Sequence, residues 1–117
     1  MEFAIELYET HTGSRPVQNF LDEVKKSDSD DFAAVLAGLV RLRNREYHRP
    51  PLSKPLGDGL FELRHVGKLN TRMLYFFAFG RRIIIVHGIR KKTRALASRD
   101  RKVALHRMRD WISRNAG

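Results

Sequence analysis

The sequence predicts a single domain of the α+β class, in which a helical hairpin covers one face of an antiparallel sheet. Apolar residues alternate at the period of a strand near the N-terminus and again over residues 60–88, whereas they recur at helical spacing over residues 15–45 and after Ser98. The chain has 117 residues, and two halves of that length would each be too small for a core of their own. We therefore expect one domain spanning residues 1–117.

The first half of the chain reads as a strand followed by two helices. Apolar and polar positions alternate near the N-terminus, which predicts a strand over residues 2–9. Ser14 stands just ahead of a proline and is the expected N-cap of a helix over about residues 15–26. Ser29 is the expected cap of a second helix that reaches about Arg45, and the short break between the two helices predicts an antiparallel hairpin.

The second half reads as a sheet followed by a helix. Three prolines between positions 50 and 55 predict an extended loop, which leads through a turn at residues 56–59 into the sheet. The last predicted strand is apolar at consecutive positions, which favours an interior place with the N-terminal strand as a candidate neighbour. Ser98 is the expected cap of the final helix. Three strands joined by hairpin-length connections form the predicted meander, over residues 60–66, 70–79 and 82–88.

The basic residues are unevenly placed. The chain holds 23 Lys and Arg against 13 Asp and Glu, for a formal net charge of +10. Residues 1–31 carry a net charge of −5 and residues 32–117 a net charge of +15. Like charges confined to a patch raise the local potential by several kT, so we expect one surface that attracts polyanions, with nucleic acid as the leading candidate. A basic surface that serves only solubility is the alternative.

Several classes of protein are excluded by composition. The chain has no cysteine, which excludes disulfides, thiolate zinc sites and thiol nucleophiles, and its histidines lack the paired spacing of a metal site. The N-terminus does not read as a signal peptide, and the longest apolar run, residues 73–79, is too short to span a bilayer. We expect a cytoplasmic protein that uses no metal or other cofactor.

Strand alternation places a group of charged residues on one face of the predicted sheet. Glu62, Arg64 and Arg72 lie on the face opposite the apolar residues that are expected to meet the helices. A cationic face beside the basic loop after the last strand forms a groove suited to phosphodiesters, because arginine donates two hydrogen bonds to one phosphate. The residues predicted to contact nucleic acid around this groove are Lys68, Arg90 and Arg94.

The reaction that such a groove suits is RNA cleavage with the neighbouring 2′-OH as nucleophile. This reaction needs cations to stabilise the extra charge on the phosphate, a base for the 2′-OH proton and an acid for the leaving oxygen. Arg64 and Arg72 fit the first need. His87, Lys91 and Lys92 are candidates for the other two, because histidine titrates near neutrality and a cationic cluster lowers the pKa of a lysine.

Each candidate also has a purely structural interpretation. Glu62 and Arg64 are equally consistent with a surface ion-pair network. His87 follows an isoleucine-rich run and is consistent with a histidine at the core edge that bonds to the backbone. The aromatic residues over 75–79 are expected in the core rather than on a platform for nucleic-acid bases.

Three segments together resemble the phage-derived RelE-like proteins, the HigB-type toxins of bacterial toxin–antitoxin pairs in the RelE/ParE superfamily. They are GLFELR at residues 59–64, TRMLYF at residues 71–76 and HGIRKKT at residues 87–93, in the order and spacing of that family. The resemblance implies a RelE/ParE-like fold and an endoribonuclease that cleaves mRNA, usually on the ribosome. It also implies a cognate antitoxin, often with a helix-turn-helix domain. The residues that match the family's basic groove by position are Arg64, Arg72, Lys91 and Lys92.

The chain departs from the family pattern near its C-terminus. Leu96-Ala97 stands where the family has Thr-Pro, and Trp111 stands where a tyrosine is frequent. Arginine, lysine and histidine are therefore the expected catalysts of a metal-independent endoribonuclease. Two alternatives stay open, because related proteins on the same fold act differently: a ParE-like inhibitor of DNA gyrase, and an inactive nucleic-acid-binding co-repressor that acts with its antitoxin.

Overall fold

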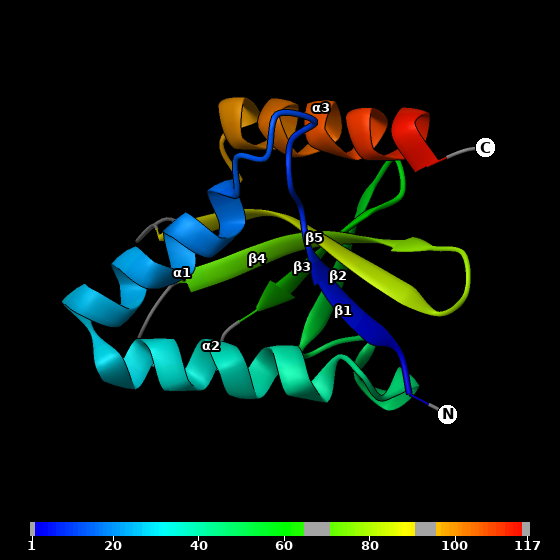
Figure 1. Cartoon of the computed structure of the whole chain (residues 1–117). Coiled ribbons are helices and arrows are strands. Elements are labelled where there is room, and N and C mark those ends of the chain that lie inside the picture. The colour runs from blue at the N-terminus through cyan, green and yellow to red at the C-terminus, as the bar shows by residue number, and fades with distance from the viewer. Residues whose placement is uncertain (1, 65–70, 91–95, 116–117) are drawn as a thin grey trace.

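A five-stranded mixed sheet forms the middle layer of the molecule. The computed structural model describes residues 2–64, 71–90 and 96–115, and within them no helix is long and apolar enough to cross a membrane. The helical hairpin lies on one side of the sheet and the C-terminal helix on the other (Figure 1), which confirms the α+β class. The elements are β1 (Ala4–Leu7), α1 (Pro16–Ser27), α2 (Ser29–Arg41), a 3-10 turn η1 (Arg45–Tyr47), β2 (Ser53–Gly57), β3 (Leu60–Arg64), β4 (Thr71–Ala78), β5 (Arg82–Arg90) and α3 (Ser98–Asn115).

The strand order in the sheet is β1-β5-β4-β3-β2. β1 pairs with β5 in parallel, and the other neighbours pair in antiparallel fashion. The meander predicted from the sequence and the placement of the N-terminal strand beside its last strand are both confirmed. Residues 83–86 of β5 are fully buried, as expected for an interior strand that is covered on both faces.

β2 is the strand that the sequence pattern did not reveal. The segment was predicted to be an extended loop, but Ser53–Gly57 pairs with β3 at the edge of the sheet. Pro55 lies in this strand, and an edge strand tolerates a residue without an N–H because one side of the strand has no neighbour. The Ser53 hydroxyl donates to the Tyr47 carbonyl at 2.8 Å and accepts from the Tyr75 hydroxyl at 2.8 Å, which ties the edge to the middle of the sheet.

The helix caps differ from those predicted. Ser14 is not the cap of α1; its backbone N–H bonds to the Thr10 hydroxyl at 3.0 Å and closes the preceding loop, and the N-cap residue makes no side-chain hydrogen bond. α2 is capped by Asp28 rather than Ser29, because the Asp28 carboxylate accepts the backbone N–H of Asp31 at 3.0 Å. α2 also ends at residue 41, earlier than predicted, and the chain continues into η1.

The two faces of the sheet meet different helices. Leu63 lies against Gly38 of α2, so the odd positions of β3 face the hairpin as predicted. The opposite face, which was expected to be open, is covered in part by α3, where Phe76 packs edge-on against Trp111 with ring centroids 5.6 Å apart. α3 therefore covers this face over β4 and β5.

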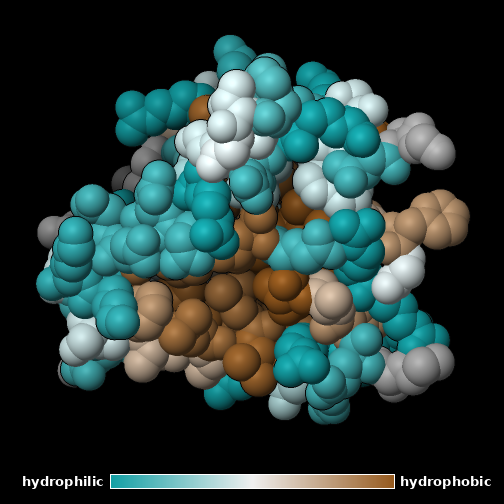
Figure 2. Space-filling model, in the orientation of Figure 1, coloured by the Kyte–Doolittle hydropathy of each residue, from teal (hydrophilic) through white to brown (hydrophobic). Residues whose placement is uncertain are grey.

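An apolar area remains exposed on the hairpin layer. Figure 2 shows it as a continuous hydrophobic area over α2 and beside β1, bordered by hydrophilic side chains. In α2, Leu36 is 40% exposed and Val40 is 63% exposed. Contiguous exposed apolar surface on a small protein commonly marks a site of protein interaction.

Candidate active site

The centre of the candidate site is a carboxylate shared by two arginines. Arg64 and Arg72 lie directly opposite one another on β3 and β4, and Glu62 lies on the same face of the sheet. Arg64 Nε donates to Glu62 Oε1 at 3.0 Å, and Arg72 Nη1 lies 3.7 Å from Glu62 Oε2. Like charges that face each other across a ladder repel, so the Glu62 carboxylate stabilises the pair of guanidiniums.

The three members of this cluster differ in exposure. The side chain of Glu62 is 3% exposed, that of Arg72 is 11% exposed and that of Arg64 is 43% exposed. The ion pair expected between Glu62 and Arg64 exists, but it is not a surface network because its carboxylate is buried. Arg64 is thus the accessible cation of the cluster, whereas Arg72 is largely enclosed.

His87 lies in the neighbouring row of the same face and is held by two side chains. Its strand partner is Leu74, which in turn faces Glu62, so one strand separates His87 from the carboxylate. His87 Nε2 lies 2.9 Å from Asp100 Oδ1, and His87 Nδ1 lies 3.3 Å from Arg107 Nη1. Arginine can only donate, so Nδ1 accepts and Nε2 carries the proton toward Asp100. His87 thus lies at the core edge, as the structural interpretation expected, and its ring contacts the side chains of Asp100 and Arg107.

Asp100 and Arg107 are the residues of this site that the sequence did not single out. Arg107 also donates to the Val86 carbonyl at 2.9 Å, and burial lowers the pKa of its guanidinium. The two residues are seven positions apart on α3, a spacing that returns to the same helix face. That spacing, with an acid in the first turn of a helix rich in basic residues, is the signal that points to them.

Arg90 lies away from the other predicted site residues. It pairs in register with Thr71 on the hairpin side of the sheet, where its Nη1 donates to Ser27 Oγ at 2.5 Å and its Nη2 lies 3.5 Å from Asp31 Oδ2. The buried Asp31 carboxylate also accepts the Thr71 hydroxyl at 2.5 Å. The structure therefore does not bring Arg90 beside Arg64. Four other predicted residues lie outside the described part of the chain: Lys68, Lys91, Lys92 and Arg94.

A cavity of about 250 Å³ opens beside Arg64, between α2 and the end of β3. Arg41 of α2 lines another part of its wall, with Leu63 and Thr71 among the remaining residues. Arg41 and Arg64 thus both line this cavity. Among the described residues no cluster of His, Asp or Glu suits a metal ion.

The residues of this site lie in a segment that matches a known protein family. The family described as Phage derived protein Gp49-like (DUF891) matches residues 19–109 of the chain, a stretch that contains every described residue of the candidate site. The chain belongs to the Gp49-like family. This family is associated with the toxins of toxin–antitoxin systems. Among the curated proteins, none matches the chain.

Membership in the Gp49-like family confirms the coarser part of the resemblance noted in the sequence. The Gp49-like family is phage-derived and toxin-like, and a toxin of a toxin–antitoxin system pairs with an antitoxin. The family covers most of α1 and all of the sheet from β2 to β5. The arginine cluster, and His87 with Asp100 and Arg107, thus lie within the part of this Gp49-like chain that the family matches.

Proposed function

We propose that this Gp49-like chain is the toxin of a type II toxin–antitoxin pair of the RelE/HigB type, and that it cleaves mRNA as a metal-independent endoribonuclease. The observation that carries the proposal is the Arg64–Glu62–Arg72 cluster, which holds one accessible guanidinium on a buried carboxylate. The family supplies the toxin-like class, and the cluster supplies groups that suit a phosphodiester substrate.

In the proposed mechanism Arg64 stabilises the phosphorane. Its Nε is occupied by Glu62, so the Nη donors are the ones left for two equatorial phosphate oxygens. Negative charge grows on these oxygens as the 2′-OH attacks, and a preorganised donor gains strength at that moment. Arg72 contacts the other oxygen of Glu62, and its role is to position the carboxylate and thereby Arg64.

Proton transfer falls to Lys91 and Lys92, with His87 as the lesser candidate. His87 uses both ring nitrogens within the protein, at Asp100 and Arg107. Nδ1 is the nitrogen without a proton, so His87 must release Arg107 before it accepts a proton from a 2′-OH. This requirement favours the two lysines as base and acid.

The proposed partners follow from the class. They are mRNA on the ribosome as substrate and a cognate antitoxin, of the helix-turn-helix type, that silences the toxin in the cytoplasm. The exposed apolar area over α2, with Leu36 and Val40, supports a protein partner of this kind.

The test compares two arginine variants that each lose one ion pair with a glutamate. Arg64→Gln removes the accessible guanidinium of the site, whereas Arg43→Gln removes one that pairs with Glu2 at the surface. Purified proteins are incubated with end-labelled mRNA in the presence and in the absence of ribosomes, and the products are examined for 2′,3′-cyclic phosphate ends. We expect Arg64→Gln to lower the cleavage rate by about 100-fold and Arg43→Gln to leave it unchanged. Equal rates for the two variants refute the assignment.

The same proteins distinguish the proposed function from its alternatives in growing bacteria. Arrest with mapped transcript cleavage supports the endoribonuclease. Arrest with intact transcripts and inhibited DNA gyrase supports the ParE-like alternative, and absence of arrest with salt-sensitive nucleic-acid binding supports the co-repressor.

A further inference from the structure

The outer face of α3 carries a line of cations that the candidate active site does not use. Positions spaced three and four residues apart form one stripe on a helix, and on α3 the stripe that points away from buried Ala104 and Met108 is exposed at every position. We name it the α3 stripe; its members are Arg99, Lys102, His106, Arg109 and Ser113.

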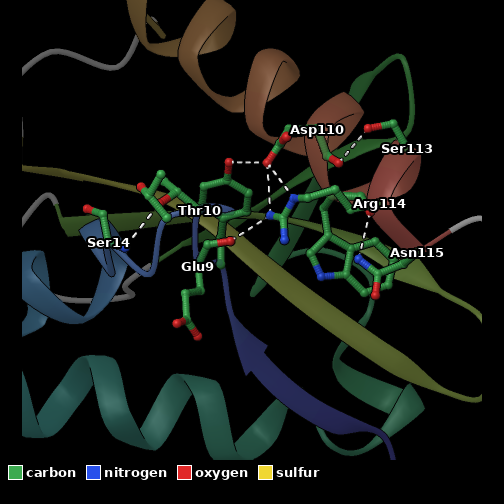
Figure 3. Close-up of polar contacts among 10 residues, drawn as sticks. Glu9, Thr10, Ser14, Asp110, Ser113, Arg114 and Asn115 are labelled. Carbon is green, nitrogen blue, oxygen red and sulfur yellow. Dashed lines mark hydrogen bonds and ion pairs between the residues drawn. The ribbon is translucent and has the colours of Figure 1, made fainter.

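No acid of α3 offsets these charges, because both of its acids are engaged elsewhere. Asp100 bonds to His87. Asp110 accepts the Tyr8 hydroxyl at 2.5 Å and the Nε and Nη2 of Arg114 at 3.1 and 2.9 Å (Figure 3). The Arg114 hydrogen bond is the main reason that the pKa of Asp110 is lowered.

The stripe cations themselves are not neutralised. Among the described residues, Arg99, Lys102 and Arg109 form no ion pair. Among the described residues, the α3 stripe therefore carries positive charge that no ion pair offsets from Arg99 to Arg109.

α3 is also held rigidly against the rest of the protein. Near its first turn, Arg101 donates to the Leu56 carbonyl at 2.7 Å and to the Asp58 carboxylate at 2.8 Å. In its last turn, Arg114 donates to the Glu9 carbonyl at 2.6 Å. Because the helix is fixed in place before it binds a ligand, the freedom lost on binding is mainly that of the stripe side chains.

We propose that the α3 stripe binds the phosphate backbone of structured, A-form RNA at a surface separate from the cleavage site. From Arg99 to Arg109 a helix rises about 15 Å, a length along which a duplex strand presents several phosphates. The stripe is a second surface, and its binding requires no cleavage.

The shape and the residue types favour RNA over DNA. α3 packs along the sheet, so it presents a ridge rather than a free helix that enters a major groove. The stripe contains no Asn or Gln, the residues that read adenine edges in that groove. A-form RNA offers a wide, shallow minor groove flanked by phosphates and is recognised largely by shape, which suits a cationic ridge.

The experiment removes three stripe charges and compares the loss with three charges removed elsewhere. The stripe variant is Arg99→Gln/Lys102→Gln/Arg109→Gln. The control variant, Lys25→Gln/Lys26→Gln/Arg45→Gln, alters exposed residues of α1 and η1 on the hairpin side of the molecule. Both variants lower the formal net charge from +10 to +7, and the thermal melts of both are compared with that of the wild type.

The probe is a 2′-O-methyl RNA stem-loop, which keeps the A-form but lacks the 2′-OH nucleophile. Its affinity is measured by fluorescence anisotropy between about 50 and 200 mM salt. We expect the stripe variant to bind about tenfold more weakly or worse, and the slope of log K against log salt to fall by about three. The control variant is expected to bind like the wild type.

Three outcomes overturn the inference: an equal loss in the control variant, wild-type binding by a folded stripe variant, and equal stripe-dependent binding of a DNA duplex of the same sequence. Cleavage of a short single-stranded RNA is measured in parallel and is expected to survive in the stripe variant. If the wild type cleaves neither free nor ribosome-bound RNA while the stripe still binds the stem-loop, the proposed function fails and this inference stands.

Discussion

Replacing Glu62 by glutamine removes the charge at the centre of the arginine cluster while keeping the shape of the side chain. The wild-type carboxylate is 3% exposed and contacts Arg64 and Arg72 through its two oxygens. The introduced glutamine retains one acceptor for Arg64 but presents an amide NH₂ group to the other guanidinium. Two arginines that lie opposite each other in the ladder thereby lose the carboxylate that they share.

The size of the effect follows from burial. Removing one partner of a buried ion pair costs about 3–5 kcal/mol, because the remaining charge stays in a poorly solvated place. The side chain of Arg72 is 11% exposed, so little water replaces the lost carboxylate oxygen there, whereas Arg64 is 43% exposed and remains hydrated. We take about 3 kcal/mol for Glu62→Gln. With a urea m-value of about 2 kcal/mol/M, the midpoint of unfolding falls by about 1.5 M.

The assay is urea denaturation followed by circular dichroism, with Glu2→Gln as the matched control. Glu2 also pairs with an arginine, but its side chain is 67% exposed and that of Arg43 is 48% exposed. An exposed ion pair contributes less than about 1 kcal/mol. Adding Arg72→Met to Glu62→Gln restores part of the loss, with a coupling of about 1–3 kcal/mol. Midpoints for Glu62→Gln and Glu2→Gln that agree within error refute the reasoning.

Three further changes test other parts of the fold. The hydrogen bond from Arg114 lowers the pKa of Asp110. The ionised Asp110 carboxylate therefore stabilises the fold above the ordinary carboxyl pKa of about 4, and this stabilisation is lost as the pH falls through the lowered pKa. Thermal melts between about pH 2.5 and 6 are expected to show a melting temperature that depends less on pH for Asp110→Asn than for the wild type. Gly88→Ala places a methyl 2.3 Å from the Phe20 ring and costs about 1–3 kcal/mol in urea denaturation, and adding Phe20→Leu recovers part of it. Phe79 is 97% exposed, so Phe79→Ser leaves the thermally measured stability within about 0.5 kcal/mol.

The local pattern of apolar residues was sufficient to predict the strands of the sheet wherever that pattern coincides with burial. The isoleucine-rich run at residues 83–86 predicted an interior strand, and those residues are fully buried. Alternation on β3 assigned Leu63 to the helical side and Glu62 to the other, and contact of Leu63 with Gly38 bears this out. A period of two is a direct consequence of strand geometry, so it can be recognised in the sequence without knowing which segments pair in the fold.

Contacts between residues that are far apart in the sequence could not be predicted in the same way. β2 contains Pro55, which argues against a strand until its place at the sheet edge is known. Asp100 became a partner of His87 only because α3 folds back over the sheet. Arg90 was grouped with Arg64 by charge, whereas the register of β5 turns it to the other face. Each case depends on tertiary packing, which has no local period.

The arrangement of charge explains why composition alone gives a poor forecast of polyanion binding. Three acids of the negative N-terminal segment pair with cations from the positive remainder of the chain, as Glu2–Arg43, Glu6–Arg82 and Asp31–Arg90. These pairs hold the N-terminus, β1 and α2 to distant elements and offset the charge of their arginines. The cations left for a polyanion are those whose neighbouring acids are buried or engaged, as at Arg64 and along the α3 stripe. Affinity for nucleic acid should therefore follow the position of a removed charge rather than the net charge, which is why the variants compared above are matched in charge and differ only in place.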